Sequence, residues 1–378
     1  MKNLYSLKIT LLALALCMPV EGKVSTAFPP EIFVFGDSLS DQGNVWLLTG
    51  CFTSQQVPSE EYFMGRFSNG PVYIEHMADL LDLIVEPIES VDCTQSILLG
   101  GWQPGNGNNF AYGGARTNGH RSGLELLGVV GQVNSFTVGL AASGGMIDPD
   151  TLFVLFAGAN NIQDAIGAAN DDREEAKTAM RTSTDDIIKK VSTAAKEIGD
   201  AIKDLAASGA RIFLVPNGPD WGVVPAVIRL ENGTETGVPL PGYRAFASGI
   251  SAAFNQRLVA ELDNVEAKLE QAGLKVLIIR FDFHNLLRNM VENPDLYGFE
   301  NVTDRCFQGD DLTFTGGGTV CVNPDAYLFW DRVHPSAAAH AFIGNCFYKA
   351  IFPLVGQTKP GLSGPAQNDA PPQCAFLD

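Results

Sequence analysis

Residues 32–41 read IFVFGDSLSD, an apolar, β-branched and aromatic run that ends at Gly36 and is followed at once by polar residues. A short apolar run of this kind is typical of a strand buried in a parallel sheet. The glycine lets the chain turn, and Ser38 is then expected at the start of the next helix. The stretch therefore predicts a strand that delivers a serine to the carboxyl end of a sheet, where the reactive groups of open α/β sheets collect.

Three further runs have the same buried-strand character, at residues 152–156, 211–215 and 275–281. Between them lie helical patterns, and the clearest has apolar residues three and four apart over 187–205 before Gly209. Residues 242–273 and 336–352 predict two more helices, whereas 50–109 predict loops with one short helix near 73–83. Strands that alternate with helices predict a single doubly wound α/β domain, its parallel sheet covered on both faces.

The two ends of the chain differ from this domain. Residues 1–22 place two lysines before an apolar run and then small residues, which is the pattern of a signal peptide. The run is about 12 residues long, too short to span a bilayer, which takes about 20. We therefore expect a secreted protein without stable membrane insertion, with a domain at 23–355 and a Pro- and Gly-rich tail at 356–378.

Secretion favours disulfides over metal binding for the cysteines. Cys17 leaves with the signal peptide, and six cysteines remain: Cys51, Cys93, Cys306, Cys321, Cys346 and Cys374. Up to three disulfides are expected, with Cys306–Cys321 the firmest pair because a polar, Gly-rich stretch separates them; Cys374 could hold the tail. Asn232 and Asn301 begin glycosylation sequons, which are used only in a eukaryote.

The formal net charge is −18. Phosphate backbones and anionic membrane surfaces repel such a chain, so nucleic acid is not an expected partner. The sequence has no zinc-protease or phosphate-loop motif, and neither metal nor organic cofactor is expected. The oligomeric state is left open.

Ser38 and a segment near the end of the chain, residues 329–335 (FWDRVHP), carry the candidate chemistry. His334 could accept the serine proton, and Asp331, three residues earlier in a turn, could fix the imidazole tautomer. Each feature also has an ordinary explanation: Ser38 as an N-cap, Asp331 as a turn cap and His334 as a surface residue. The other four histidines have no such neighbour and are expected to be structural or exposed.

Two further segments could supply hydrogen-bond donors to an oxyanion. Residues 158–161 (GANN) follow the second strand, and residues 109–114 (NFAYGG) lie in the loop before it. An Asn side chain and a Gly backbone N–H are suitable donors for acyl transfer, although both residue types are also common in turns.

Together these segments resemble the GDSL esterase/lipase family, also called SGNH hydrolases. The resemblance rests on residues 35–44, 109–115, 158–161 and 331–335, in the order the family has them. It implies a three-layer α/β/α sandwich with a flavodoxin-like central parallel sheet. It also implies that Ser38 is the nucleophile, His334 the base and Asp331 its partner.

The same resemblance implies an oxyanion hole made of the Ser38 N–H, the Gly114 N–H and the Asn160 side chain, with Gly113 a close competitor for the glycine. This chain has Asn161 where the family often has Asp, which puts the bracing of that loop in question.

The expected function is therefore a secreted serine hydrolase that cleaves a lipid or other ester through an acyl-enzyme. Lipase or phospholipase activity, polysaccharide deacetylation and acyl transfer to another alcohol all remain open. A catalytically inactive binding protein on the same scaffold is the alternative from a different class, and its mark would be a missing member of the Ser38, Asp331 and His334 set.

Overall fold

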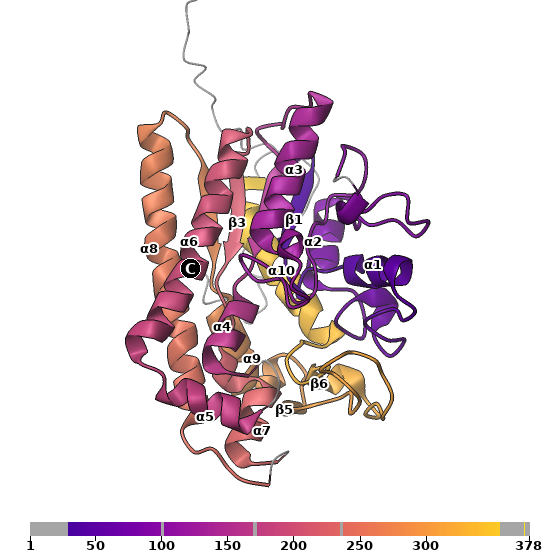
Figure 1. The fold of residues 1–378 in the computed structure, drawn as a ribbon, viewed down its shortest axis with the longest axis vertical. Coiled ribbons are helices and arrows are strands. Elements are labelled where there is room, and N and C mark those ends of the chain that lie inside the picture. Colours follow the sequence, from indigo (N-terminus) through magenta and orange to yellow (C-terminus); the bar gives the residue numbers. More distant parts are fainter. Residues whose placement is uncertain (1–28, 100–101, 169–171, 235–236, 356–373, 375–378) are drawn as a thin grey trace, which may run out of the picture.

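A parallel sheet in the order β1-β2-β3-β4 forms the centre of the computed structural model, which describes residues 29–99, 102–168, 172–234, 237–355 and 374 (Figure 1). Its strands are β1 (Ile32–Gly36), β2 (Leu152–Phe156), β3 (Ile212–Pro216) and β4 (Leu277–Phe281). All three pairings are parallel, with Ile32 opposite Leu152 and Ile212 opposite Leu277. The predicted signal segment and the predicted tail apart from Cys374 lie outside the described residues.

An extended segment pairs with the free edge of β1. Val34 N–H donates to the Asn108 carbonyl at 3.0 Å, and Phe110 N–H donates to the Val34 carbonyl at 2.7 Å. The segment precedes β2 in the chain but lies on the other side of β1. Counted as a strand, it gives the flavodoxin-like order 2-1-3-4-5, in which the direction of winding reverses beside β1.

Helices cover both faces of the sheet, as the sequence predicts. In Figure 1, α3 (Val129–Ser143) and α6 (Thr184–Ala207) lie on the near face, and α10 (Ala337–Val355) passes behind it. Helix α8 (Tyr243–Gln271) packs along α6, and α2 (Tyr73–Leu81) packs along α10. The shorter helices are α1 (Asn44–Phe52), α4 (Ala159–Ile166), α5 (Arg173–Arg181), α7 (Pro225–Asn232) and α9 (Phe283–Glu292).

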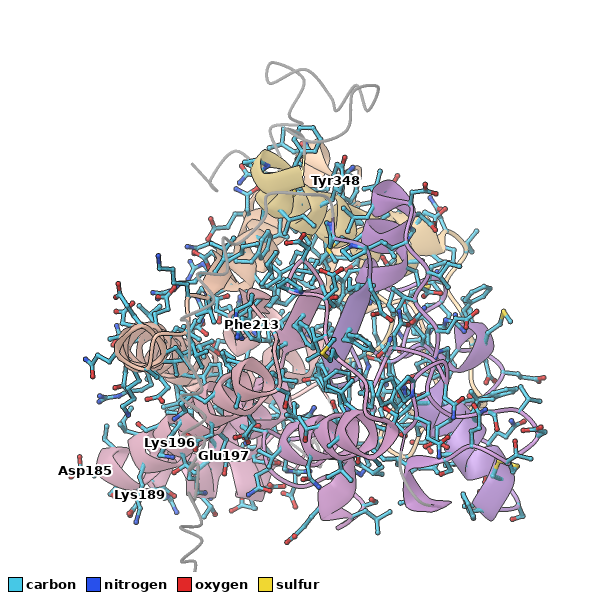
Figure 2. All side chains as sticks on the ribbon, turned by 90° about the horizontal axis from the view of Figure 1, so that it is seen from above. Asp185, Lys189, Lys196, Glu197, Phe213 and Tyr348 are labelled. Carbon is cyan, nitrogen blue, oxygen red and sulfur yellow. A yellow bond between two sulfur atoms is a disulfide. The ribbon has the colours of Figure 1, made fainter. Side chains whose placement is uncertain are left out.

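The long helices begin and end close to where their sequence patterns predict. Ser183 caps α6 by accepting a hydrogen bond from Asp186 N–H, and Gly209, with a φ of 117°, follows its end. Every position of the predicted apolar stripe in α6 is buried except the half-buried Ile188, and Gly199 and Ala206 beside the stripe are buried as well. Figure 2 shows the result: Phe213 lies within the packed layers, whereas Asp185 and Lys189 lie at the outer edge of α6.

Two predictions about the elements are wrong in detail. The predicted buried strand 275–281 begins only at Leu277, and as the edge strand β4 it is only partly buried: Ile278 and Phe281 are buried, whereas Arg280 is exposed. The predicted loop region from residue 50 begins inside α1, whose apolar run is too short to show helical periodicity.

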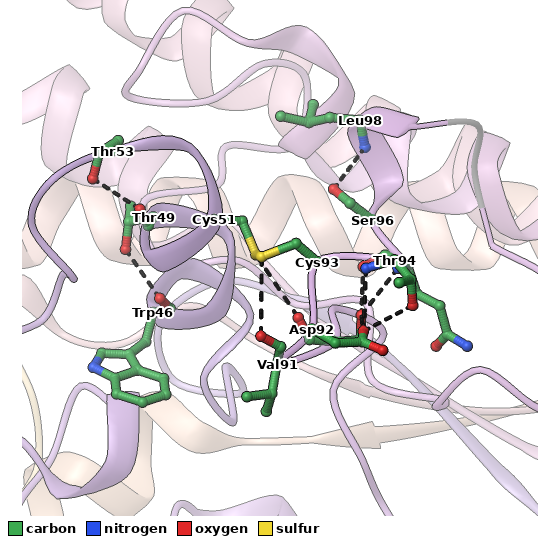
Figure 3. The surroundings of a disulfide bond; sticks show 12 residues. Trp46, Thr49, Cys51, Thr53, Val91, Asp92, Cys93, Thr94, Ser96 and Leu98 are labelled. Atoms are coloured by element: carbon green, nitrogen blue, oxygen red, sulfur yellow. Dashed lines mark hydrogen bonds between the residues drawn. A yellow bond between two sulfur atoms is a disulfide. The ribbon is translucent and has the colours of Figure 1, made fainter.

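Three disulfides join the six cysteines expected to remain after signal removal. The predicted Cys306–Cys321 pair is present, together with Cys51–Cys93 and Cys346–Cys374. Figure 3 shows Cys51–Cys93, which joins the last turn of α1 to the loop around Asp92. The Cys346–Cys374 pair ties the tail to α10, as the sequence suggested.

A second, two-stranded parallel sheet consists of β5 (Asn301–Arg305) and β6 (Tyr327–Phe329). It leads the chain back to the main sheet and places residues 330–335 directly after β6. No helix among the described residues is long and apolar enough to cross a membrane.

The end of β1 requires glycine for a steric reason. A Cβ at Gly36 would lie 2.5 Å from the Phe156 carbonyl oxygen of the neighbouring strand. We predict that Gly36→Ala lowers the free energy of unfolding by about 2 kcal/mol, because two paired strands would have to separate locally. Urea denaturation followed by circular dichroism measures this change.

Gly249→Ala is the matched control, because Gly249 lies in α8 and a Cβ there would meet nothing within 4 Å. It should raise the free energy of unfolding by about 1 kcal/mol through helix propensity. Equal effects of the two substitutions would contradict the steric account of Gly36.

Candidate active site

Ser38 lies in a single turn directly after β1. The Asp37 carbonyl accepts hydrogen bonds from Ser40 N–H at 3.0 Å and Asp41 N–H at 3.1 Å, which closes the turn. The prediction that Ser38 begins a helix is wrong, because α1 starts only at Asn44. Negative charge at Ser38 is therefore not stabilised by the N-terminus of a long helix, and backbone and side-chain donors must supply that stabilisation.

The Asp331 and His334 side chains reach Ser38 from the segment that follows β6. His334 Nε2 lies 2.8 Å from Ser38 Oγ, and His334 Nδ1 lies 2.6 Å from Asp331 Oδ2. With the proton on Nδ1, the ring donates to the carboxylate and accepts from the serine hydroxyl. All three residues are buried, and residues 296 positions apart in the chain are thus brought into hydrogen-bond contact.

Asp331 also shapes its own turn. Its Oδ1 accepts hydrogen bonds from Val333 N–H at 2.9 Å and His334 N–H at 2.7 Å. Burial alone would raise the pKa of Asp331, but the neighbouring His334 and these hydrogen bonds outweigh burial and lower it. The carboxylate is therefore held in its charged form beside the imidazole.

Tyr62 is a fourth side chain at this site, and no motif in the sequence marks it. Its hydroxyl donates to Asp331 Oδ2 at 2.9 Å, the same oxygen that faces the His334 ring. Burial and the charges of Asp331 and Asp311 raise the pKa of Tyr62, so the hydroxyl keeps its proton and acts as a donor. Tyr62 comes from the irregular 50–109 region, where sequence patterns predict neither position nor contacts.

The groups that could stabilise an oxyanion border one cavity. They are the N–H of Ser38, the N–H of Gly113 or Gly114, and the Asn160 side chain. Gly113 N–H donates to Asp41 Oδ2 at 2.8 Å and is occupied, whereas the N–H groups of Gly114 and Ser38 have no acceptor among the described residues. The Asn160 side chain donates one N–H to the Ala115 carbonyl at 2.9 Å, and its amide also acts as a hydrogen-bond donor toward the buried Asp37 carboxyl beside Ser38. The geometry thus favours Gly114 over Gly113 as the glycine donor.

Asp41 connects the parts that carry these donors. Its carboxylate also accepts backbone hydrogen bonds from Gly43 at 2.8 Å and Asn44 at 2.6 Å, at the start of α1. Burial raises the pKa of Asp41 to about 6 even though these bonds oppose the shift. One carboxylate thus ties the Ser38 turn, the start of α1 and the 113–114 loop together.

Two asparagines in the recognised segments brace the loops. Asn109 donates to the Ser40 carbonyl at 2.7 Å and to Gln42 Oε1 at 2.8 Å. Asn161 accepts from Thr117 N–H at 2.9 Å and donates to Thr117 Oγ1 at 3.1 Å. An asparagine in place of the usual aspartate therefore still braces this loop, because its amide both accepts and donates.

Two hollows meet at Ser38. The first, which we call the narrow pocket, has a volume of about 40 Å³ and apolar walls that include Trp221, Phe283 and Phe329. The second, which we call the wide cavity, has a volume of about 310 Å³ and contains Gly114 and Asn160 in its wall. Ser38 and His334 border both hollows, so the parts of a substrate on either side of the reacting carbonyl have separate places to lie.

Two of the remaining histidines have structural contacts, as expected. His120 Nε2 lies 2.6 Å from the Gly113 carbonyl oxygen, and the buried His340 accepts Tyr73 N–H at Nδ1. Burial, with the nearby His76 and His334, lowers the pKa of His340 to about 3 and keeps it neutral. Among the described residues, no three His, Cys, Asp or Glu side chains are grouped in a way that could hold a metal ion.

Comparison with known proteins finds relatives that are all described as GDSL lipases, esterases or related proteins. A family model described as GDSL-like Lipase/Acylhydrolase matches residues 32–347. A GDSL esterase/lipase of Arabidopsis thaliana is 27% identical over 351 residues, which are 83% of this chain and 83% of the relative. An Arabidopsis protein described as an inactive GDSL esterase/lipase-like protein is 23% identical over 338 residues, covering 88% of this chain and 74% of its own.

Among solved structures, a member of the lipolytic protein G-D-S-L family from Veillonella parvula matches 85% of this chain and 98% of its own, with a TM-score of 0.34 and 11% identity. The family match includes both the Ser38 turn and the Asp331–His334 segment.

The Tyr62 hydroxyl gives a prediction for the reactivity of Ser38. Tyr62→Phe removes one donor from Asp331 Oδ2, so the carboxylate attracts the protonated imidazole more strongly. We expect the rate of Ser38 labelling by a fluorophosphonate to fall about three- to tenfold at neutral pH. The midpoint of its rise with pH should also move upward, which the labelling rate between pH 5 and 9 measures.

Tyr243→Phe is the control, because it removes another buried hydroxyl that donates to the Ile166 carbonyl, away from Asp331. It should leave that midpoint unchanged. An unchanged midpoint in Tyr62→Phe would mean that Tyr62 only fills space.

Asp37 gives a prediction for stability. Its carboxyl group is buried, and burial raises its pKa to about 7, against a model-peptide value of about 3.9. The unfolded chain thus releases this proton at lower pH than the folded chain, and stability is lost as pH rises from about 4 to about 7. Asp37→Asn should remove that loss. The free energy of unfolding at pH 7.5 minus that at pH 4.5 should then be a few kcal/mol higher in the variant than in wild type.

Urea denaturation at the two pH values measures the difference. Asp185→Asn, at an exposed position on α6, is the control and should keep the wild-type pH dependence. The same pH dependence in Asp37→Asn and wild type would show that Asp37 is ionised throughout.

Proposed function

Since this chain belongs to the GDSL-like lipase/acylhydrolase family, we propose that it hydrolyses carboxylic esters with Ser38 as nucleophile, His334 as general base and Asp331 as its orienting partner. The observation that supports this assignment is the unbroken series of hydrogen bonds from Ser38 Oγ through the imidazole to the Asp331 carboxylate. This is the arrangement that serine hydrolases on unrelated folds use to activate a hydroxyl group.

In the first half-reaction, Ser38 Oγ attacks the ester carbonyl while His334 Nε2 takes the hydroxyl proton. Negative charge develops on the carbonyl oxygen, where the N–H groups of Ser38 and Gly114 and the Asn160 side chain would meet it. The tetrahedral intermediate collapses, the protonated imidazole gives its proton to the leaving alcohol, and the acyl group stays on Ser38.

In the second half-reaction, water takes the place of the alcohol. His334 removes a proton from the water as it attacks the acyl-enzyme, and the imidazole then returns that proton to Ser38 Oγ as the acid leaves. Asp331 keeps the ring in the same orientation through both halves, because its hydrogen bond to Nδ1 is present whether Nε2 is protonated or not. The proton and acyl transfers thus involve Ser38, His334, the substrate and water.

The hollows beside Ser38 support an ester with an apolar part, as in a lipase-like substrate. The wide cavity has apolar side chains such as Val45, Phe67 and Phe314 in its wall, and it is far larger than an acetyl group requires. Polysaccharide deacetylation would draw support from exposed tryptophans, but Trp102 and Trp221 are buried and Trp46 is half-buried. We therefore favour a lipid or similar apolar ester over an acetylated polysaccharide.

We further propose that the protein is secreted after removal of residues 1–22, leaving a hydrolase domain at 23–355 and a tail at 356–378. Three disulfides are in keeping with an oxidising compartment. Asn232 and Thr234 are exposed, which would leave that sequon accessible to a glycosyltransferase.

Loss of Ser38 gives the test of this function. We expect Ser38→Ala to lower the hydrolysis of p-nitrophenyl esters by more than about a thousandfold, because no other group takes the place of the attacking oxygen. The assay uses a short-to-long acyl series beside a phospholipid and an acetylated polysaccharide, and circular dichroism checks that the variant is folded.

Ser40→Ala is the matched control, since Ser40 lies in the same turn but its hydroxyl contacts Tyr73. It should keep most of the activity. Retained activity in folded Ser38→Ala would overturn the nucleophile, and an inert wild type that also fails to react with a fluorophosphonate would place the chain with inactive members of the family.

A further inference from the structure

The two hollows at Ser38 differ in their access to solvent as well as in size. Arg121, Ser122 and Thr313 border the wide cavity and are exposed, so this cavity opens at the protein surface. None of the described residues that border the narrow pocket is exposed, and apart from four polar residues, Ser38 among them, its wall is apolar. The narrow pocket is thus a largely enclosed apolar space beside the reacting serine.

The volume of the narrow pocket sets the length of chain that it can hold. Roughly 10–15 Å³ of such space holds one water-sized group, so a pocket of about 40 Å³ holds about three. Three groups of that size correspond to the propyl chain of a butyryl ester. The wide cavity, with a volume of about 310 Å³, has room for a much larger group.

Buried hydrogen bonds hold the Trp221 wall of the narrow pocket in place. Trp221 N–H donates to Ser251 Oγ at 3.1 Å. The carboxylate of the preceding Asp220 accepts Gly222 N–H at 2.9 Å and the Ser248 hydroxyl at 2.6 Å. A Cβ at Gly222 would clash with Ser248 Oγ, so this segment packs directly against α8. Such a wall does not move aside for a longer chain without the loss of these contacts.

Helix α9 supplies another part of the wall. Phe283 and Leu287 both border the narrow pocket, and because they are four residues apart they lie on the same face of the helix. Phe283 packs edge-to-face on Phe156 at the end of β2, with 5.0 Å between the ring centroids. Leu286, the next residue before Leu287, is also buried but borders neither hollow. Truncation of these two leucines therefore separates a change in the pocket from a change in the core.

The order of the proposed half-reactions distinguishes the two sides of the ester. The acyl group stays on Ser38 while the alcohol leaves with a proton from His334 and water takes its place. The space that holds the alcohol must therefore exchange its contents with solvent, and the wide cavity opens to solvent. The acyl group needs no such exchange at that step, so an enclosed pocket suits it.

We propose that the narrow pocket holds the acyl group and limits it to about four carbons, and that the wide cavity holds a larger, partly apolar alcohol. The proposal rests on the proposed ester hydrolysis and names its substrate class, short-chain esters of bulky alcohols. Leu287 is then a residue that determines specificity. Val45, Phe67 and Phe314 would contact the alcohol.

The test varies the two sides of the ester separately. p-Nitrophenyl acetate, butyrate and octanoate differ only in the acyl chain, whereas ethyl acetate and hexyl acetate differ only in the alcohol. For each ester, kcat/KM is measured in wild type, in Leu287→Ala and in the matched control Leu286→Ala. Release of p-nitrophenol follows the first series, and proton release at constant pH follows the second.

In wild type, we expect kcat/KM for the octanoate to be at least about tenfold below that for the butyrate, because chain atoms that do not fit weaken binding of the transition state. The value for hexyl acetate should equal or exceed that for ethyl acetate, since a longer apolar alcohol buries more surface. Leu287→Ala enlarges the narrow pocket and should raise the octanoate-to-butyrate ratio about tenfold, without a change in the hexyl-to-ethyl ratio. Leu286→Ala should leave both ratios as in wild type.

Val224→Ala shortens another residue of the same wall and repeats the test if Leu287→Ala does not fold, with the buried Val227→Ala as its control. A wild type that cleaves the octanoate as fast as the butyrate would overturn the proposal. So would unchanged ratios in both pocket variants, or a rise of the hexyl-to-ethyl ratio instead, because the alcohol would then lie in the narrow pocket. Failure of the proposed function has a different signature, since wild type would cleave none of these esters.

Discussion

The buried carboxylate of Asp331 is the constraint on which the site depends. A charge withdrawn from water is costly unless hydrogen bonds surround it, and here four donors do so: two backbone N–H groups of its own turn, the His334 ring and the Tyr62 hydroxyl. Meeting that requirement holds the turn after β6, orients the imidazole and anchors Tyr62 of the 50–109 region at the site. Ser38 is positioned beside the His334 ring by the end of β1.

A second carboxylate does the same for the donors on the other side of Ser38. Asp41 accepts the Gly113 N–H, whereas the next N–H, that of Gly114, has no acceptor among the described residues, and Gly114 borders the wide cavity. In the proposed mechanism, Asp331 orients the imidazole that would accept the proton, and Asp41 holds the loop whose N–H groups would meet the developing negative charge. Both rely on backbone N–H groups, which side-chain variation elsewhere in the chain does not remove.

Much of the fold could be predicted because its signals are local. The strand at 32–36 and the long α6 follow from apolar periodicity, and the Cys306–Cys321 pair from the loop it closes. Predictions failed where packing outweighs local pattern. The turn at Ser38 has a sequence compatible with a helix start, but the Asp41 carboxylate accepts the N–H groups of Gly43, Asn44 and the sequence-distant Gly113, and α1 begins only at Asn44.

The sequence by itself determined the fold class and the family, and it predicted which side chains react, because residue type and periodicity record which groups are apolar and which can react. Only the tertiary structure decided that Tyr62 contacts Asp331, that the Gly113 N–H is occupied, and that Trp221 and Leu287 border one pocket. These are contacts between segments distant in the chain. Their geometry depends on how whole layers pack, and no local pattern carries that information.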